Sequence, residues 1–301
     1  MKKLVIATRR SRLALWQAEH IAALLRKFHP GLGVELLPLS TRGDELIDQR
    51  LDKAGGKGLF VKELESAMAE GRADLAVHSM KDVPAELPAG FALVAITARE
   101  DPRDVLLSRK FRTLGDMPKG ATVGTSSLRR SAQIMERHPA LEARLLRGNV
   151  DTRLAKLDRG EYDAIVLAAA GLVRLGLESR ISARLGTDEM LPAPGQGALG
   201  IECVDDRAEL AALLAPLADP ATAACVRAER TVSRALGGSC SLPLAAFAEI
   251  ISQKIQLRAL VASADGRRVL RSELSGADPE EVGNRVAQEL RSQGADEILG
   301  L

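Results

Sequence analysis

Hydrophobic and polar positions along the first 80 residues follow a strand, helix, strand, helix, strand order. Residues 3–8 form a short apolar run that is typical of a buried strand, and apolar residues at helical spacing follow from Leu13 to Leu25. Three further elements are predicted, namely a strand over residues 34–39, a helix around Phe60, Leu64 and Met68, and a strand over residues 73–79. This order predicts an α/β domain with a mostly parallel sheet.

The same series of elements recurs over residues 121–171. Strands are predicted over residues 121–124, 141–146 and 164–169, separated by helices that end at His138-Pro139 and at Gly160. A His-Pro pair ends the first helix of each series, and a Gly-x-x-Asp motif precedes each third strand. We therefore predict two similar α/β lobes, with a ligand cleft between them at the carboxyl ends of the strands.

The pattern changes after about residue 217, which indicates a small third domain. Its predicted elements are a helix over residues 221–236, strands over 244–250, 255–262 and 269–273, a tight hairpin at Asp265-Gly266 and a helix start at Asp278-Pro279. The chain is predicted to cross back between the two lobes at residues 192–195. The strand predicted next, over residues 199–203, fits either lobe. The predicted division is residues 1–97 with 198–216, residues 98–197, and residues 217–301.

Composition and charge narrow the classes of function. The 301 residues are 46% hydrophobic, which is ample for packed cores, but only 2% aromatic, which disfavours a stacking platform for single-stranded nucleic acid. A net charge of +2 disfavours a general nucleic-acid or membrane-surface binder. Basic residues shorten the N-terminal apolar run and no segment is long enough to span a bilayer, so we expect a cytoplasmic protein.

Four arginines stand at two predicted loop-to-helix junctions. Arg129 and Arg130 follow Thr-Ser-Ser after one strand, and Arg147 and Arg153 flank Gly-Asn-Val-Asp-Thr after the next. A helix N-terminus attracts anions, and guanidinium groups suit several carboxylates or phosphates at once. Any single arginine is more often a solvated surface residue. The combination of hydroxyls and arginines at both junctions favours a site for a polyanion.

Two glycine-rich segments resemble phosphate or nucleotide sites in part. Residues 195–200 match the spacing of a dinucleotide fingerprint, but prolines precede them and a strand follows, so the context excludes that fold. Lys57 lies in Gly-Gly-Lys-Gly without the Ser or Thr of a phosphate-binding loop. That loop is interpreted equally well as a mobile flap near an anion or as an ordinary surface loop.

Asp82 and the cysteines leave alternatives open. Asp82 follows the third strand beside Ser79 and Lys81, so it is a structural ion-pair partner, the commoner case, or a group that stabilises developing positive charge. Cys203 and Cys225 fit apolar cores, whereas Cys240 lies in a Gly-Gly-Ser-Cys loop and is a candidate nucleophile or attachment point. Cysteine and histidine spacing indicates neither a disulfide framework nor a metal site.

Taken together, these motifs resemble the porphobilinogen deaminase family. The matching segments are ATRRSRLALWQA (7–18), GGKGLFVKELE (55–65), AVHSMKDVP (76–84), GTSSLRR (124–130), LRGNVDTRL (146–154), PGQG (194–197) and the GGSC loop (237–240). They occur in order over nearly the whole chain. Departures are mild: Ser239 stands where the family often has Gly or Asn, and Leu244-Ala245 replaces a frequent Ile-Gly.

The resemblance implies a fold and a reaction. The expected fold is α/β, with two similar periplasmic-binding-protein-like lobes of mostly parallel sheets and a small α+β domain with a three-stranded antiparallel sheet. Such enzymes join four porphobilinogen molecules head to tail into hydroxymethylbilane and release ammonia each time. They do so from a dipyrromethane cofactor held as a cysteine thioether. The resemblance also implies a monomer with no nucleic-acid or membrane partner.

Residue roles are carried over by position. The resemblance makes Cys240 the thioether and Asp82 the catalytic group that holds pyrrole N–H groups and stabilises a cationic azafulvene. The remaining cofactor-binding positions are Ser79, Lys81, Thr125, Ser127, Arg129, Arg130, Arg147 and Gln196. Substrate-binding positions are Arg9, Ser11, Arg147, Arg153, Arg174, Lys53 and Lys57, the two lysines lying in a lid of residues 42–58.

The residues themselves support this chemistry without the resemblance. Each pyrrole carries two carboxylates, so a growing chain accumulates negative charge that arginines and hydroxyls can bind. A single carboxylate of the protein can stabilise the cation that develops in the reaction. A second hypothesis is a non-catalytic two-lobed anion-binding module, which the Cys240 loop and the missing export signal disfavour. A phosphate-ester enzyme built on the Lys57 loop ranks last, because no metal-ligand cluster accompanies it.

Overall fold

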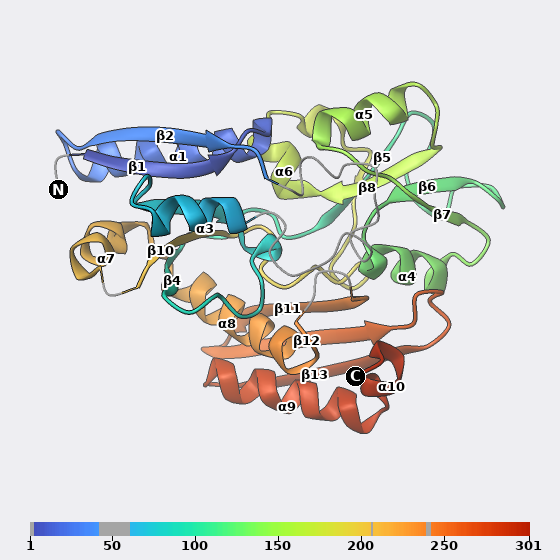
Figure 1. Cartoon of the computed structure of the whole chain (residues 1–301). Coiled ribbons are helices and arrows are strands. Elements are labelled where there is room, and N and C mark those ends of the chain that lie inside the picture. Colours follow the sequence, from blue (N-terminus) through green and yellow to red (C-terminus); the bar gives the residue numbers. More distant parts are fainter. Residues whose placement is uncertain (1–2, 42–60, 206, 239–241) are drawn as a thin grey trace. The chain divides into compact units, whose positions relative to one another are not determined.

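A computed structural model describes residues 3–41, 61–205, 207–238 and 242–301 (Figure 1). The chain divides into two compact units, which are Met1–Glu100 with Ala198–Ala223, and Asp101–Gly197 with Ala224–Leu301. Unit 1 and unit 2 are used below for these two parts. The predicted division into three domains at residues 97, 197 and 217 stays a prediction.

In its described residues, unit 1 is built on a five-stranded sheet with the order β2-β1-β3-β10-β4. The elements are β1 (Lys3–Arg9), α1 (Arg12–Phe28), β2 (Gly33–Leu39), α3 (Lys62–Ala69), β3 (Leu75–Ser79), η1 (Met80–Asp82), β4 (Phe91–Ile96), β10 (Leu199–Val204), α7 (Ala208–Leu214) and η3 (Ala215–Leu217). Strands β2, β1 and β3 are parallel, and β10 runs antiparallel to β3 and β4.

Helices α1 and α3 cover opposite faces of this sheet. Leu4, Ile6 and Val77 pack with the apolar side of α1, whereas Ala7 and Ala76 pack with that of α3. Successive side chains of a strand point to opposite faces, which accounts for this division. Both helices therefore bury their apolar sides on the sheet, and the residues after β1 and β3 emerge at one sheet edge.

In the part of unit 2 that the structure describes, a second sheet has the matching order β7-β6-β8-β5-β9. Its elements are β5 (Asp104–Ser108), β6 (Thr122–Thr125), α4 (Leu128–Arg137), β7 (Glu142–Leu145), α5 (Val150–Asp158), β8 (Ala164–Ala168), α6 (Ala169–Arg174), η2 (Glu178–Arg180) and β9 (Ala183–Arg184). Strands β7, β6 and β8 are parallel, and β5 is antiparallel to both neighbours. The predicted repeat of one α/β pattern is thus confirmed.

The fourth strand of each sheet is the one that enters its unit after a crossing of the chain. β10 follows the crossing after Gly197 and lies in the first sheet, which settles the assignment that the sequence left open. β5 follows the crossing after Glu100 and takes the same position in the second sheet. The sequence pattern missed β4 and β5, because both are short apolar runs without a helical pattern directly after them.

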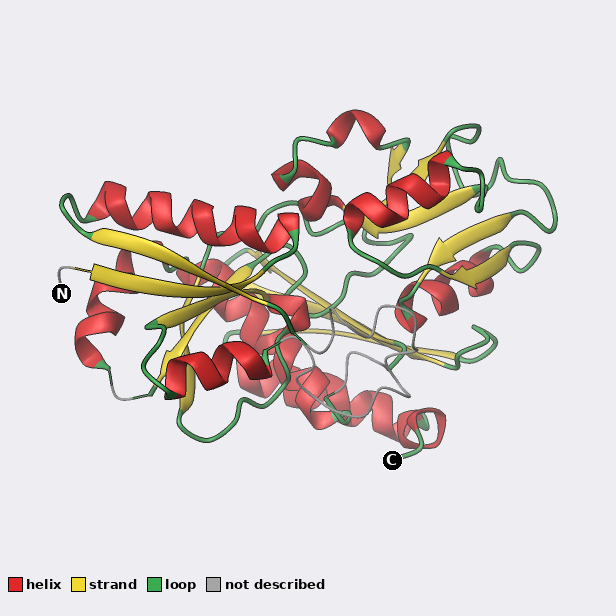
Figure 2. Cartoon of the chain, turned by 45° about the horizontal axis from the view of Figure 1, so that its top comes forward, coloured by secondary structure: helices red, strands yellow, loops and turns green. Residues whose placement is uncertain are grey.

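The C-terminal part of unit 2 contains a three-stranded antiparallel sheet with the order β11-β12-β13, as predicted. Its elements are α8 (Pro220–Ala235), which begins in unit 1, β11 (Leu244–Ile251), β12 (Lys254–Ala262), β13 (Val269–Gly276), α9 (Pro279–Ser292) and α10 (Ala295–Leu299). Asp278 begins α9 by accepting a hydrogen bond from the Glu281 backbone N–H at 2.7 Å. Figure 2 shows the separate helices and sheets of the fold in a second view.

The C-terminal sheet also packs against α4. Ala132 of α4 joins Phe247 and Leu260 in one buried apolar cluster. The hairpin turn between β12 and β13 approaches α4 so closely that a Cβ on Gly266 would lie 2.4 Å from the Ala132 carbonyl oxygen. Gly266 has a φ of +71°, so both its conformation and its surroundings require glycine.

Among the helices of the described ranges, none is by itself long and apolar enough to cross a membrane. Two helical segments joined at a bend, Ala208–Leu217 and Pro220–Ala235, together have the length and apolar composition of a membrane span, and only these two properties point to one.

Candidate active site

The junction between β1 and α1 in unit 1 forms as the sequence predicted. Ser11 is the N-cap of α1, and its Oγ accepts a hydrogen bond from the Ala14 backbone N–H at 3.4 Å. The Thr8 hydroxyl donates to the Ala14 carbonyl at 3.0 Å, which holds the end of β1 against the first turn of the helix. Arg9, the last residue of β1, is half-buried at this junction.

The end of β3 carries Ser79, Lys81 and Asp82. Ser79 Oγ accepts a hydrogen bond from Gln17 Nε2 at 2.8 Å, which ties β3 to α1. The chain then turns through η1, where Lys81 is half-buried and Asp82 is exposed. Because β1 and β3 are parallel neighbours, their carboxyl ends bring Arg9, Ser79 and Asp82 to one edge of the sheet.

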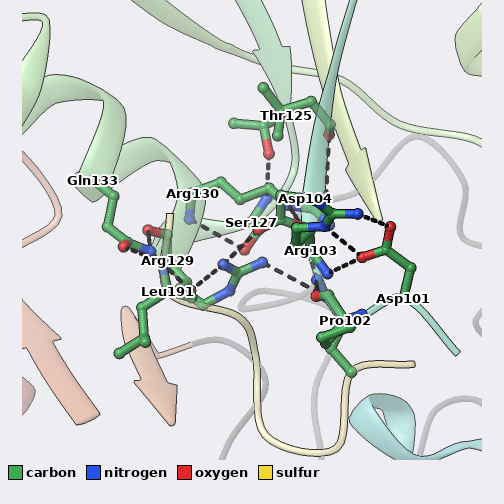
Figure 3. Close-up of polar contacts among 12 residues, drawn as sticks. Asp101, Pro102, Arg103, Asp104, Thr125, Ser127, Arg129, Arg130, Gln133 and Leu191 are labelled. Carbon is green, nitrogen blue, oxygen red and sulfur yellow. Dashed lines mark hydrogen bonds and ion pairs between the residues drawn. The ribbon is translucent and has the colours of Figure 1, made fainter. Parts of the chain in front are cut away.

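Unit 2 has the equivalent junction between β6 and α4 (Figure 3). Thr125 Oγ1 accepts a hydrogen bond from the Ser127 backbone N–H at 3.2 Å. Ser127 is the N-cap of α4, and its Oγ accepts from the Arg130 backbone N–H at 3.4 Å. Both hydroxyls therefore shape the start of the helix that carries the arginine pair, as the Thr-Ser-Ser-Leu-Arg-Arg pattern predicts.

Arg129 and Arg130 are buried and share one internal carboxylate. Arg129 Nη1 donates to Asp104 Oδ2 at 2.7 Å, and Arg130 Nη2 and Nε donate to Asp104 Oδ1 at 2.7 and 3.1 Å. Main-chain carbonyls take further N–H groups, since Arg129 donates to Leu191 at 2.6 Å and Arg130 to Val166 at 3.1 Å. Figure 3 shows these side chains converging on Asp104 at the start of β5.

Asp104 was not anticipated from the sequence. It is fully buried, and it stands 25 and 26 positions before the two arginines, in a segment with no recognisable motif. Burial alone would raise the pKa of Asp104, but the charges and hydrogen bonds of Arg129 and Arg130 lower it well below its usual range. Asp104 therefore stays ionised, and the three groups together carry one net positive charge.

Gln196 connects the return crossing to this cluster. Its Nε2 donates to Asp104 Oδ1 at 2.9 Å and to the Pro102 carbonyl at 2.6 Å. Its Oε1 lies 3.5 Å from Arg129 Nη2, at the limit for a hydrogen bond. Next in the chain, the Gly197 carbonyl accepts from Arg174 Nη2 at 2.7 Å. Arg174 thus contacts the residue that follows Gln196, and both side chains are buried.

The segment between β7 and α5 holds Arg147 and Arg153. Asn149 is the N-cap of α5 and accepts from the Thr152 backbone N–H at 2.9 Å. Arg153 Nε donates to the Gly148 carbonyl at 2.8 Å, so this side chain folds back onto the loop before its own helix. Arg147 and Arg153 are both half-buried.

Several predicted site residues lie outside the described residues, namely Cys240, Lys53 and Lys57 with the whole of the predicted lid, residues 42–58. Cys203 and Cys225 are buried, as expected for core thiols. Within the described ranges, no group of three or more His, Cys, Asp or Glu side chains could hold a metal ion.

The structure thus defines the class: an α/β protein with two sheets of matching strand order, in which arginines at helix N-termini suit the binding of carboxylates. Comparison with known proteins identifies the family. The family model "Porphobilinogen deaminase, dipyromethane cofactor binding domain" matches residues 4–212, and "Porphobilinogen deaminase, C-terminal domain" matches residues 223–292. The chain belongs to the porphobilinogen deaminase family.

Curated relatives extend over almost the whole chain. A porphobilinogen deaminase of Bordetella parapertussis is 58% identical over 301 residues, covering 99% of this chain and 96% of that protein. One from Paraburkholderia phytofirmans is 59% identical, covering 98% and 88%. Weaker likenesses exist to solved structures. The methionine-binding protein MetQ has a TM-score of 0.47 at 13% identity, covering 72% of this chain and 89% of that chain. The aliphatic sulphonate binding protein SsuA from Escherichia coli has a TM-score of 0.42 at 17% identity, covering 78% and 70%.

Proposed function

We propose that the protein joins four porphobilinogen molecules head to tail into hydroxymethylbilane, with release of ammonia, starting from a dipyrromethane cofactor held on Cys240. Family membership over nearly the full length supports this reaction. The observation that carries the proposal is the buried pair of arginines with a single internal carboxylate, because it leaves net positive charge for an acidic oligomer.

The residues of unit 2 fit a polycarboxylate such as dipyrromethane. Arg129 Nε is buried and makes no hydrogen bond within the described part of the chain. A buried donor without a partner is costly, so a ligand carboxylate at this position would be stabilised. Arg129, Arg130, Thr125, Ser127, Arg147 and Gln196 would hold the cofactor, and Arg153 and Arg174 the substrate.

The residues of unit 1 fit the reacting end of the site. Asp82 is exposed at the carboxyl end of β3, where an ionised carboxylate can accept hydrogen bonds from pyrrole N–H groups and stabilise the cation left when ammonia departs. Ser79 and Lys81 would hold cofactor carboxylates, and Arg9 and Ser11 substrate carboxylates. Lys53 and Lys57 are proposed to bind substrate from the lid.

The cofactor would supply the primer, a covalently held pyrrole end to which each new unit is joined. Cys240, which follows α8 in the sequence, is proposed as its attachment point. With a net charge of +2, we also propose a cytoplasmic monomer that acts on small molecules, without a nucleic-acid or membrane partner.

Intact-mass measurement of the fresh protein tests the proposal. The wild-type chain should be heavier than its sequence mass by two pyrrole units, and Cys240→Ala should lose both that mass and activity. Cys225→Ala is the matched control, because Cys225 is buried and should leave the adduct in place. Asp82→Asn should keep the adduct but lose most turnover. A bare wild-type chain that binds a dicarboxylate reversibly would instead identify a non-catalytic anion-binding module.

A further inference from the structure

Strand β10 lies directly beside the segment that ends in Asp82. Leu199 pairs with Ser79 and Gly200 with His78 in the antiparallel ladder. The Met80 backbone N–H donates to the Ala198 carbonyl at 3.0 Å, so the first residue of η1 is also fixed to the start of β10. Asp82 follows two residues later, without a strand of its own to hold it.

Gly200 provides the space that the Met80 side chain occupies. A Cβ built on Gly200 would lie 2.3 Å from Met80 Sδ and 2.9 Å from Leu93 Cδ2. Met80 is only 1% exposed, so its side chain has no solvent to move into. The φ of Gly200 is not in the left-handed region, and the backbone conformation therefore permits any residue. Space for Met80, rather than backbone conformation, is what requires glycine here.

Two residues further along β10, Glu202 meets His78 on the same face of the sheet. His78 Nε2 lies 2.8 Å from Glu202 Oε2, and both side chains are buried. This contact pairs a buried carboxylate with a buried imidazole and links β10 to β3. Glu65 of α3 packs near them, and burial together with the charge of Glu202 raises its pKa to about 6.

Burying polar groups in an otherwise apolar region costs free energy, and the proposed reaction gives no role to Glu65, His78 or Glu202. Their place in the fold indicates one, because His78 and Met80 flank Ser79 and lead into Asp82. Resting on the proposed function, we propose that β10 positions Asp82 for the reaction: Gly200 and Glu202 fix Met80 and His78, and these fix the turn that carries the carboxylate. Gly200 and Glu202 are positioning residues, since neither touches the substrate.

The test is Gly200→Ala, which adds one methyl group and changes no charge. We expect kcat to fall about 10- to 100-fold, the effect of a displacement of about 1 Å at a reacting group. KM should stay within a few-fold and the dipyrromethane mass should remain, because the arginine cluster lies in unit 2 and is untouched. Gly186→Ala is the matched control, since a Cβ there meets nothing within 4 Å and its φ is ordinary. It should behave as wild type.

A rescue variant separates positioning from loss of folding. Met80→Val removes the atom that the new methyl group would strike, so Gly200→Ala should cost less kcat in that background than in the wild type. An unchanged kcat in Gly200→Ala, or equal losses in both backgrounds, would overturn the inference. Glu202→Gln should also lower kcat, with a smaller relative change in KM. An inactive wild type without the adduct would instead refute the proposed function, so the two failures are distinguishable.

Discussion

Glu65→Gln should stabilise the protein at neutral pH and not at acidic pH. Glu65 is 8% exposed on α3, and its pKa is raised from 4.5 to about 6, first by burial and then by Glu202. The folded state therefore prefers the neutral carboxyl group. Its stabilising contribution is fully present below pH 4.5, the value for the unfolded chain, and is lost as the pH rises through 6.

The size of the effect follows from the pKa difference. A rise from 4.5 to about 6 corresponds to at most about 2 kcal/mol between the two ends of this pH range. Glutamine has the shape of the neutral acid but cannot ionise, so the variant should not lose this stability. Relative to wild type, its Tm should therefore rise by roughly 4 to 8 °C at most between about pH 4.5 and pH 8.

Thermal unfolding followed by circular dichroism across that pH range measures the difference. Glu19→Gln, an exposed position on α1, is the control and should give a constant Tm difference from wild type. If wild type and Glu65→Gln have parallel Tm profiles from pH 4.5 to 8, the carboxyl group does not titrate as argued, and the electrostatic account of this cluster is wrong.

Two further substitutions test the packing around the arginine helix. Asp104→Asn should lower the free energy of unfolding by about 3 to 5 kcal/mol, because it leaves two buried guanidinium groups without their counter-charge; denaturant unfolding measures this, and a loss under 1 kcal/mol would contradict it. Gly266→Ala should destabilise by more than 1 kcal/mol, since its methyl group meets the α4 backbone and φ is +71°, whereas Gly186→Ala should be neutral in the same assay. Equal stability of these two glycine variants would show that the hairpin does not press on α4.

The sequence predicted those parts of the fold that depend on local pattern. Helical spacing and the His-Pro stops located α1 and α4, and in the structure the hydroxyl residues Ser11 and Ser127 are their N-caps. Local rules succeed here because a cap satisfies backbone N–H groups within three residues of itself.

Pairings between distant segments could not be predicted in the same way. Nothing near Asp104 indicates that its partners lie on α4, and nothing near Glu202 indicates that it meets His78, 124 positions earlier. Both carboxylates occupy strands that enter a sheet after the chain crosses between units. Their neighbours are set by strand order, and one sequence alone does not specify which crossing strand takes the fourth position.

The burial of Arg129 and Arg130 has an energetic explanation that could not be predicted from the sequence. Two guanidinium groups without a counter-ion would be strongly unfavourable when buried, and full neutralisation would remove the attraction for an acidic ligand. One aspartate against two arginines lies between these limits, since it leaves a net charge of +1. Arg130 uses its Nε, Nη1 and Nη2 groups on Asp104 and Val166, whereas Arg129 keeps Nε without a hydrogen bond in the described part of the chain. The pair is thus unequal: Arg130 is held by the protein, and Arg129 retains a donor that a carboxylate would satisfy.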